Sequence, residues 1–345
     1  MQQEIIERTN VPEEDGRLPE PGWARRELFT FERKNIKSSW IKIKEWDNYI
    51  FMNDNAAISF TISDFGYAGA LCVAFIDIQN KMAIDKAELV LFPRGRKFAL
   101  GKDPVMSSGE WHNSKMDIIF KKKEDHTGRI ICNYRNFKDE KNLSVDLDII
   151  DPDYESINFV NKATEKKDSF FLNTKKNNLM AEGTVTLGDK IVRFSRDNTC
   201  GTFNWCRGVW DYNNKTYWGT GSTVLDGKPF GFNLGYRLYE TEGVSENAIL
   251  YDGVVHKLDK VGFVIPGGLK APDYMGDWKI TSNDGRFSGD FHPIVEKASL
   301  LDLKFLVSEC HQVFGRMSGT AILDNGDKIE FNDMMCALEV MRNKC

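Results

Sequence analysis

The chain has 345 residues, of which 41% are hydrophobic and 28% charged, so it is long enough to bury one large core or two smaller ones. Its 46 basic and 51 acidic side chains are mixed along the sequence and give a net charge of −5. This balance disfavours a nucleic-acid-binding protein, which would carry a basic surface, and no segment approaches the eighteen or so apolar residues of a membrane span.

Residues 1–30 form an extended lead-in by our prediction, because they contain Pro12, Pro19 and Pro21 but no periodic apolar run. We expect this segment to lie on the surface, held by Trp23. The first ten residues have neither the basic start nor the apolar stretch of a secretion signal. The seven cysteines are irregularly spaced. We therefore expect a cytoplasmic protein with reduced thiols, no metal site and no cofactor.

Apolar and polar residues alternate with a period of two along most of the chain. The clearest examples are 39–46, 57–62 and 143–149. Such alternation is typical of antiparallel strands with one buried face. The sequence therefore predicts an all-β protein.

Two-residue turn sequences separate many of these strands. Asp-Gly and Asn-Gly favour type I′ turns, because both central residues need positive φ. Segments 184–187 and 190–194 flank one such turn as a predicted hairpin. One short helix is predicted at 334–342. The turn sequences are Gly188-Asp189, Asp226-Gly227, Asp252-Gly253, Asp284-Gly285 and Asn325-Gly326.

Several longer motifs follow one another along the chain. The first half contains R-K-N-I-K-S-S-W-I-K-I-K-E-W-D-N-Y and I-S-D-F-G-Y-A-G. The second half contains N-W-C-R-G-V-W-D-Y, G-F-N-L-G, S-E-N-A-I-L-Y-D-G-V-V-H-K-L and Q-V-F-G-R-M-S-G. From about residue 16 to its end, the chain resembles a bacterial domain family of unknown function.

That family is in turn distantly similar to the lipocalin-like enzymes around tocopherol cyclase and carotenoid 1,2-hydratase. The resemblance implies two lipocalin-like antiparallel β-barrel or sandwich domains with few short helices, and a ligand cavity. The first domain would span 31–244 and a smaller second domain 245–345. Two departures stand out. Asn204 occupies a place where an Asp is common, and A-L-E-V-M-R-N-K-C replaces a tryptophan-bearing C-terminal end.

Segment 204–218 contains three tryptophans and two tyrosines around one arginine. In one interpretation, Trp205, Trp210 and Trp218 form the walls of a cavity in which Arg207 orients a polar group of the ligand. In the other, the tryptophans belong to a packed core and Arg207 points outward. An inward arginine would need a carboxylate, a bound anion or a stacked indole.

Further polar residues are candidates for the same site. Asn233 lies among apolar strand residues, where it either binds ligand or satisfies backbone at a bulge. Asn247 is a second candidate ligand contact. A carboxyl or imidazole would be needed to move protons. The candidate catalytic residues are Glu246, Asp211, Asp252 and His256.

The sequence is compatible with three functions. The first is a cofactor-independent cyclase, hydratase or isomerase, in which a desolvated carboxylic acid protonates a lipophilic substrate inside an aromatic cavity. The second is a non-catalytic carrier of a lipid-like molecule. The third is a carbohydrate-binding or carbohydrate-processing protein, because tryptophans stack on sugar rings. The expected partner is a small molecule, and the sequence makes no prediction of oligomeric state.

Overall fold

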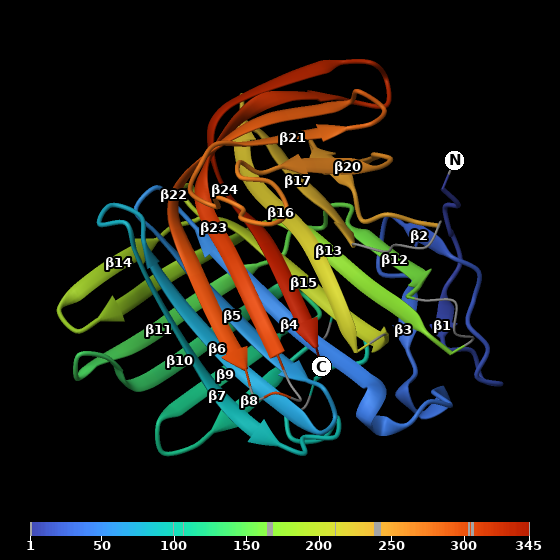
Figure 1. Cartoon of the computed structure of the whole chain (residues 1–345), viewed down its shortest axis with the longest axis horizontal. Coiled ribbons are helices and arrows are strands. Elements are labelled where there is room, and N and C mark those ends of the chain that lie inside the picture. The colour runs from blue at the N-terminus through green and yellow to red at the C-terminus, as the bar shows by residue number, and fades with distance from the viewer. Residues whose placement is uncertain are drawn as a thin grey trace.

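The computed structural model describes residues 2–98, 100–105, 107–163, 168–210, 212–237, 243–302, 304 and 307–344. Its elements are β-strands except for two 3₁₀ helices, η1 (Arg33–Asn35) and η2 (Trp40–Lys42). The strands form two large sheets that curl into half-barrels (Figure 1). The predicted all-β class with few short helices is therefore confirmed.

The first sheet contains thirteen of the described strands. Its longest path runs through ten of them. The order is β7 (Met82–Leu91), β6 (Ala68–Asp77), β5 (Ala56–Asp64), β4 (Ile43–Met52), β15 (Cys200–Val209), β13 (Phe170–Leu187), β11 (Lys141–Ile150), β10 (Thr127–Lys138), β9 (Met116–Lys122) and β8 (Gly109–His112). β12 (Ile157–Lys162) and β14 (Lys190–Phe194) pair with β13, and β2 (Gly22–Ala24) pairs with β12.

The second sheet contains nine described strands, all antiparallel. The order is β19 (Val254–Lys257), β18 (Ala248–Tyr251), β17 (Lys228–Arg237), β16 (Asn213–Leu225), β24 (Lys328–Lys344), β23 (Val307–Ile322), β22 (Phe287–Asp302), β21 (Trp278–Ser282) and β20 (Val261–Val264). In the lead-in, β1 (Thr9–Val11) pairs in parallel with β3 (Phe29–Phe31).

Each sheet curls around an apolar core of its own. The concave face of the first sheet buries residues such as Phe60, Ile118 and Leu147. The concave face of the second buries Phe232 and Ile280, among others. Side chains thus fill the interiors, as in small closed barrels.

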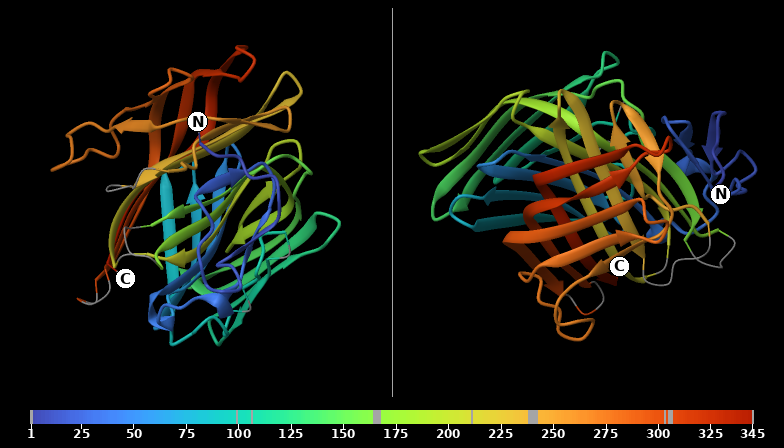
Figure 2. Two further views of the ribbon diagram at one scale, coloured as in Figure 1. Left: turned by 90° about the vertical axis from the view of Figure 1, so that its right-hand side faces the viewer. Right: turned by 90° about the horizontal axis from the view of Figure 1, so that it is seen from above.

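The two half-barrels pack against each other through their outer faces. Ile50 and Ala74 of the first sheet contact a cluster that also contains Trp218, Phe314 and Ala337 of the second. Figure 2 shows the second sheet lying against the first, seen from two further directions. The central strands of both sheets are therefore buried on both faces.

Burial on both faces explains where sequence patterning fails. Residues 334–342 were predicted as a helix, but they lie within β24, so that prediction is wrong. Met335 and Ala337 face the other sheet while Leu338 and Val340 face the core of their own, which removes the alternation. Segment 39–46 is only partly a strand, because residues 40–42 form η2 and β4 begins at Ile43.

Strands with one exposed face match their sequence-based prediction. β11 buries Leu143, Val145, Leu147 and Ile149 in alternation, and β13 turns into β14 with Leu187 opposite Lys190. In the lead-in, Trp23 is buried.

The change of sheet comes between Val209 and Asn213, before the predicted domain division at 244/245. β16 and β17 lie in the second sheet because β16 pairs with β24 from the end of the chain. The sequence cannot show so distant a pairing. The division into domains at 244/245 stays a prediction.

An asparagine pair on β13 joins the two sheets. At a register shift in this strand, Asn178 adopts a φ of 59°. Its Nδ2 donates to the carbonyl oxygens of Thr223 and Phe230, at 3.0 and 3.2 Å. The neighbouring Asn177 Nδ2 donates to Thr220 Oγ1 at 3.0 Å. The side chains of the first sheet thus satisfy groups of the second.

We predict that Asn178→Ala lowers the free energy of unfolding by about 2–3 kcal/mol, because it removes two buried hydrogen bonds. Asn178→Gly removes the same bonds but tolerates positive φ, so it should be about 1 kcal/mol more stable than the alanine variant. Urea denaturation of the three proteins measures both effects. Equal stability of wild type and Asn178→Ala would contradict this role.

Candidate functional site

A row of polar side chains crosses the outer face of the first sheet. Cross-strand pairing places Lys175 of β13 beside Asn204 of β15, and Asn204 beside Asn48 of β4. The row continues through Thr61 of β5 to Cys72 of β6. Directly paired residues project from the same face of a sheet. These five side chains therefore form one line across five strands.

A second row crosses the facing side of the second sheet. Here Trp218 of β16 pairs with Glu339 of β24, Glu339 with Gln312 of β23, and Gln312 with Lys297 of β22. Neighbouring strands are about 4.8 Å apart, so the backbones at the two ends of the row are about 14 Å apart.

The two rows meet at both ends. At one end, Lys175 Nζ lies 4.9 Å from the centroid of the Trp218 ring. At the other, the charge of Lys297 acts on the thiol of Cys72. We call the nine side chains together the polar seam. Its members are Lys175, Asn204, Asn48, Thr61, Cys72, Trp218, Glu339, Gln312 and Lys297.

The middle of the polar seam holds polar atoms without protein partners. Asn204 Oδ1 and Gln312 Oε1 are buried and accept no hydrogen bond. Asn173, two residues before Lys175 on β13, is fully buried, and neither its amide oxygen nor its nitrogen is bonded. Buried polar groups in folded proteins nearly always have partners. The polar seam therefore contains two buried acceptors, Asn204 Oδ1 and Gln312 Oε1, without a protein donor.

Glu339 is the carboxyl group of the polar seam. Its Oε2 accepts a hydrogen bond from Gln312 Nε2 at 2.9 Å and lies 3.6 Å from Cys310 Sγ. Burial raises the pKa of Glu339 above its ordinary value near 4.5, and the nearby charge of Lys297 only partly opposes this. The carboxyl is thereby brought closer to the protonated form that an acid catalyst needs.

Three of the predicted site residues meet at the Lys175 end. Trp218 Nε1 donates to Asn233 Oδ1 at 2.7 Å, and Asn233 Nδ2 donates to Glu246 Oε2 at 3.0 Å. Glu246 Oε2 also forms an ion pair with Lys175 Nζ at 3.1 Å. Protein groups thus contact Glu246 through its Oε2 atom. Asn247 lies beside them and bonds backbone, through Gly235 N at 2.6 Å and Asp259 O at 2.8 Å.

Trp205 and Arg207 lie elsewhere, inside the concave core of the first sheet. The guanidinium is fully buried, and its carbon lies 4.4 Å from the centroid of the Trp205 ring. Arg207 Nη1 donates to Asp47 Oδ1 at 2.7 Å, and Nε lies 3.5 Å from Glu45 Oε2. Arg207 Nη2 donates to the carbonyl of Gly101 at 2.9 Å. Protein groups, rather than a ligand, hold this cation, so its contacts give no support for a role in orienting substrate.

The remaining predicted residues are dispersed. Trp210 packs edge-on against Trp46 at 5.2 Å, in an aromatic cluster. Asp252 lies in an exposed turn, paired with Lys228 at 2.9 Å. Asp211 lies outside the described residues.

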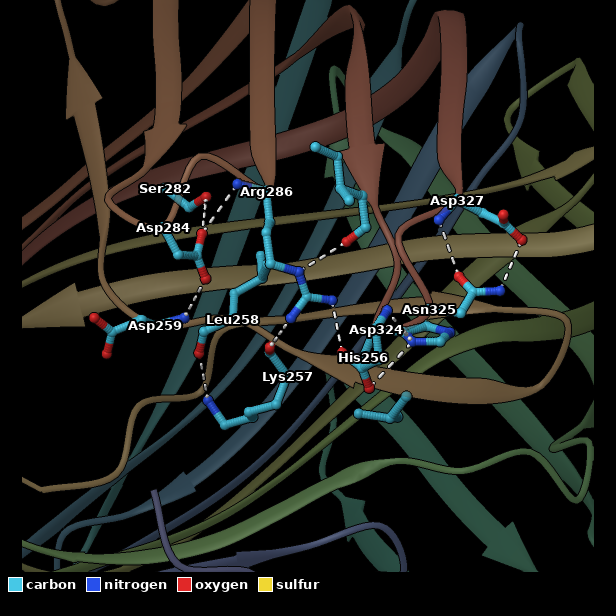
Figure 3. Close-up of polar contacts among 12 residues, drawn as sticks. His256, Lys257, Leu258, Asp259, Ser282, Asp284, Arg286, Asp324, Asn325 and Asp327 are labelled. Carbon is cyan, nitrogen blue, oxygen red and sulfur yellow. Dashed lines mark hydrogen bonds and ion pairs between the residues drawn. The ribbon is translucent and has the colours of Figure 1, made fainter. Parts of the chain in front are cut away.

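His256 belongs to a cluster at the rim of the second half-barrel (Figure 3). Its Nδ1 accepts a hydrogen bond from the backbone N–H of Asp324 at 3.2 Å. Burial lowers the pKa of His256, and the carboxylate of Asp324 opposes this. Arg286 bonds Asp324 and the carbonyl of Lys257, at 2.6 and 2.9 Å, which ties the edge strand β19 to the β21–β22 turn. His256 thus has a structural role, because its contact with Asp324 joins β19 to the turn between β23 and β24.

The described residues also enclose a recess of about 10 Å³ beside Lys122, His126 and Asp151. This volume holds about one water molecule. Asp151 Oδ2 lies 3.1 Å from Lys122 Nζ and 2.9 Å from Lys176 Nζ, so the surrounding charges are paired. Among the described residues, no three His, Cys, Asp or Glu side chains form a group that could hold a metal ion.

Comparison with family models places the chain in a known group, because residues 2–345 match the model described as a domain of unknown function, DUF2804. The chain belongs to the DUF2804 family. No curated protein matches its sequence. The predicted resemblance to a domain family of unknown function is confirmed.

Solved structures share the fold of this DUF2804 chain. An AttH-like protein of Nitrosomonas europaea is 11% identical with a TM-score of 0.50, over 87% of this chain and 92% of that one. Kievitone hydratase of Nectria haematococca is 8% identical with a TM-score of 0.50, over 87% of this chain and 88% of that one. At these identities the two likenesses show a shared fold. No helix in the described part of the chain is long and apolar enough to cross a bilayer.

Most residues of the polar seam could not be recognised as site residues from the sequence. Lys175 lies in the run N-T-K-K-N-N, and this run of polar residues inside a long strand is the signal that could have found it. Glu339, Gln312 and Lys297 have no comparable signal, because single polar residues on alternating strands usually face solvent.

We predict that Arg207→Ala lowers the free energy of unfolding by about 3–5 kcal/mol, because it leaves the buried carboxylate of Asp47 without its cation and Glu45 with only Arg33 as partner. The control is Arg129→Ala, which removes an exposed pair with Asp146 and should change stability by at most about 1 kcal/mol. Urea denaturation compares them. If both substitutions lowered the free energy of unfolding by the same amount, the Arg207 ion pairs would not be needed for stability.

Glu339 should make wild-type stability fall as pH rises. A carboxyl whose folded pKa is raised binds its proton more tightly when folded, so stability is lost from about pH 4.5 up to the folded pKa. We predict that Glu339→Gln is more stable than wild type at pH 7 and that the difference narrows toward pH 4. Denaturation at several pH values measures this.

The matched control is Glu330→Gln, on the same strand, where the bond from Lys328 lowers the pKa of an exposed carboxyl. Glu330→Gln should not be more stable than wild type at pH 7. If Glu339→Gln were less stable than wild type at pH 7, this would contradict our inference that the buried Glu339 carboxylate lowers the stability of the fold.

Proposed function

We propose that the polar seam binds a small, largely apolar molecule, and that Glu339 transfers a proton in a cofactor-independent hydration, cyclisation or isomerisation. One observation carries the proposal: a carboxyl with a raised pKa lies between the two sheets, beside Gln312, whose amide oxygen is buried without a hydrogen bond. Stability alone would favour apolar side chains at these positions.

The chemistry follows from the neighbours of Glu339. Its proton would go to one carbon of an alkene, and the π electron pair would form the new C–H bond and leave a cation on the other carbon. Trp218, the cross-strand neighbour of Glu339, offers an indole face that stabilises positive charge. Water would then add to the cation and return a proton to the Glu339 carboxylate, which restores the acid.

The unsatisfied amides have a role in the same step. Gln312 Oε1 and Asn204 Oδ1 would accept hydrogen bonds from the attacking water or from a hydroxyl of the substrate. The apolar part of the substrate would lie against the adjoining contact cluster, which contains Ile50, Phe314 and Ala337.

The fold shared with a hydratase supports this reaction class, although an identity of 8% carries neither substrate nor mechanism to this chain. A carrier for lipid-like molecules would need no acid in the polar seam, and the position of Glu339 favours a reaction. Cys72, Cys132, Cys200, Cys310 and Cys336 are free thiols, which fits the cytoplasm as the proposed compartment.

The test uses label from solvent, so it works with a substrate whose structure is still to be identified. A lipophilic extract of the host organism is incubated with the protein in H₂¹⁸O or in D₂O and analysed by mass spectrometry. We predict a compound that gains ¹⁸O for a hydration, or deuterium for a cyclisation or isomerisation. Glu339→Gln should lower the rate of labelling by 100-fold or more, because general acid catalysis contributes about 10²–10⁴-fold.

Glu330→Gln serves as the control and should label at the wild-type rate. Equal labelling by Glu339→Gln would refute the catalytic role of this carboxyl. A compound that co-purifies with wild type but is never labelled would support a carrier instead.

A further inference from the structure

Four apolar side chains gather at the surface of the first half-barrel, where β7 ends. Trp40 and Ile41 belong to η2, and Leu91 is the last residue of β7, with Phe92 next to it. Leu91 is 68% exposed and Phe92 52%, and the two residues of η2 are exposed as well. Scattered exposed apolar residues are normal, but a group of them marks a surface that binds a partner. We call these four side chains the apolar tip.

Arg94 and Gly66 hold the two segments of the apolar tip together. The guanidinium carbon of Arg94 lies 4.6 Å from the centroid of the Trp40 ring and 5.7 Å from that of the Phe92 ring. The backbone N–H of Arg94 donates to the carbonyl of Gly66 at 3.2 Å. Gly66 also packs on η2, because a Cβ at this position would lie 2.4 Å from the carbonyl oxygen of Trp40. The β5–β6 turn therefore holds both segments side by side.

The exposed charges on these two segments have one sign. Residues 33–44 contain five basic side chains and no acidic one, and residues 89–98 contain three basic side chains and no acidic one. The whole chain, in contrast, has a net charge of −5. Lys42, Arg96 and Lys97 are exposed and form a basic rim beside the apolar tip.

Two acidic residues of this region are buried. Asp64 accepts hydrogen bonds from the backbone N–H groups of Gly66 and Gly95. Its neighbour across the strands, Glu45, pairs with Arg207 inside the half-barrel. Protein groups thus engage both carboxylates below the surface. The surface above them is apolar at its centre and positive at its rim.

We propose that the apolar tip and its basic rim bind the surface of a bilayer that contains anionic lipids. The tryptophan, phenylalanine and two aliphatic side chains would enter the head-group region, while the arginine and lysine side chains stay at the level of the lipid phosphates. The exposed leucine and isoleucine favour a lipid surface over a nucleic acid, which would offer them no apolar environment. This inference goes beyond the proposed function and does not depend on the role of Glu339.

The outer face of β7 connects the apolar tip to the contact between the sheets. Side chains alternate along a strand, so Ala83, Leu89 and Leu91 project from the same face. Ala83 packs against the contact cluster of the two sheets, whereas Leu89 is exposed. This face therefore leads from the proposed bilayer surface to the region of the proposed site. A lipophilic molecule that leaves the bilayer at the apolar tip would meet it first.

The experiment measures binding of the whole chain to lipid vesicles by co-sedimentation. Vesicles made of phosphatidylglycerol and phosphatidylcholine in equal parts are compared with vesicles of phosphatidylcholine alone. The wild type should bind the anionic vesicles at least about 10-fold more tightly, because basic residues near the surface are attracted to anionic lipids. Added salt should weaken this binding, because it screens exposed charges.

Two variants separate the apolar and the charged contributions. Ile41→Ser combined with Leu91→Ser should lower the affinity for anionic vesicles at least about 10-fold, because two apolar side chains no longer enter the lipid. Arg96→Glu should lower it by a similar factor, through charge reversal. The matched control combines Leu269→Ser with Lys270→Glu, an exposed pair that follows β20 in the second half-barrel, and should bind like wild type.

The wild-type comparison needs no variant to fold, so it tests the inference directly. Equal binding to both kinds of vesicle, or binding to neither, would overturn it. Unchanged binding in the variants of the apolar tip, or loss of binding in the control, would overturn it too.

Sedimentation of the protein without lipid tests for a second copy as the partner. If the wild type dimerises and the combined Ile41→Ser and Leu91→Ser variant is monomeric, the apolar tip is an interface between copies and the inference is wrong. The labelling experiment on Glu339 is independent, because it needs no vesicles and its failure would leave binding to bilayers unchanged.

Discussion

The structure depends on one packing contact, in which two curled sheets press their outer faces together. Each half-barrel fills its own concave side with apolar residues, as Phe60 and Phe232 illustrate. Strands such as β4 and β24 are consequently buried on both faces. This arrangement turns the outer surface of each half-barrel, where polar residues would ordinarily meet water, into a second interior.

The second interior is partly apolar and partly polar. Ile50, Trp218 and Phe314 lie in the apolar part and supply hydrophobic stabilisation. The polar seam runs beside them, and its charges and unbonded amides oppose that stabilisation. Evolution tends to retain such unfavourable groups where they serve binding or chemistry. This is the physical reason for our proposal that the functional site lies between the sheets and not inside either half-barrel.

Arg207 and Lys175 show two ways in which the chain holds a buried cation. Arg207 is enclosed by Asp47, Glu45 and the indole of Trp205, so its charge is neutralised within the first half-barrel. Lys175 is buried as well, but its ion pair is with Glu246 Oε2, at 3.1 Å, across the contact between the sheets. The first arrangement closes the interior of a half-barrel, whereas the second joins the two sheets.

The sequence by itself determined the all-β class, the hairpin after Leu187 and the strand that alternates from Leu143, because each has one wet and one dry face. Its motifs also indicated the family. It could not determine β24, which is buried on both sides, or bring Lys175, Glu339 and Lys297 together. Local patterns record only whether a side chain points inward. Only tertiary structure decided that two outward faces meet, because that contact joins residues more than one hundred positions apart.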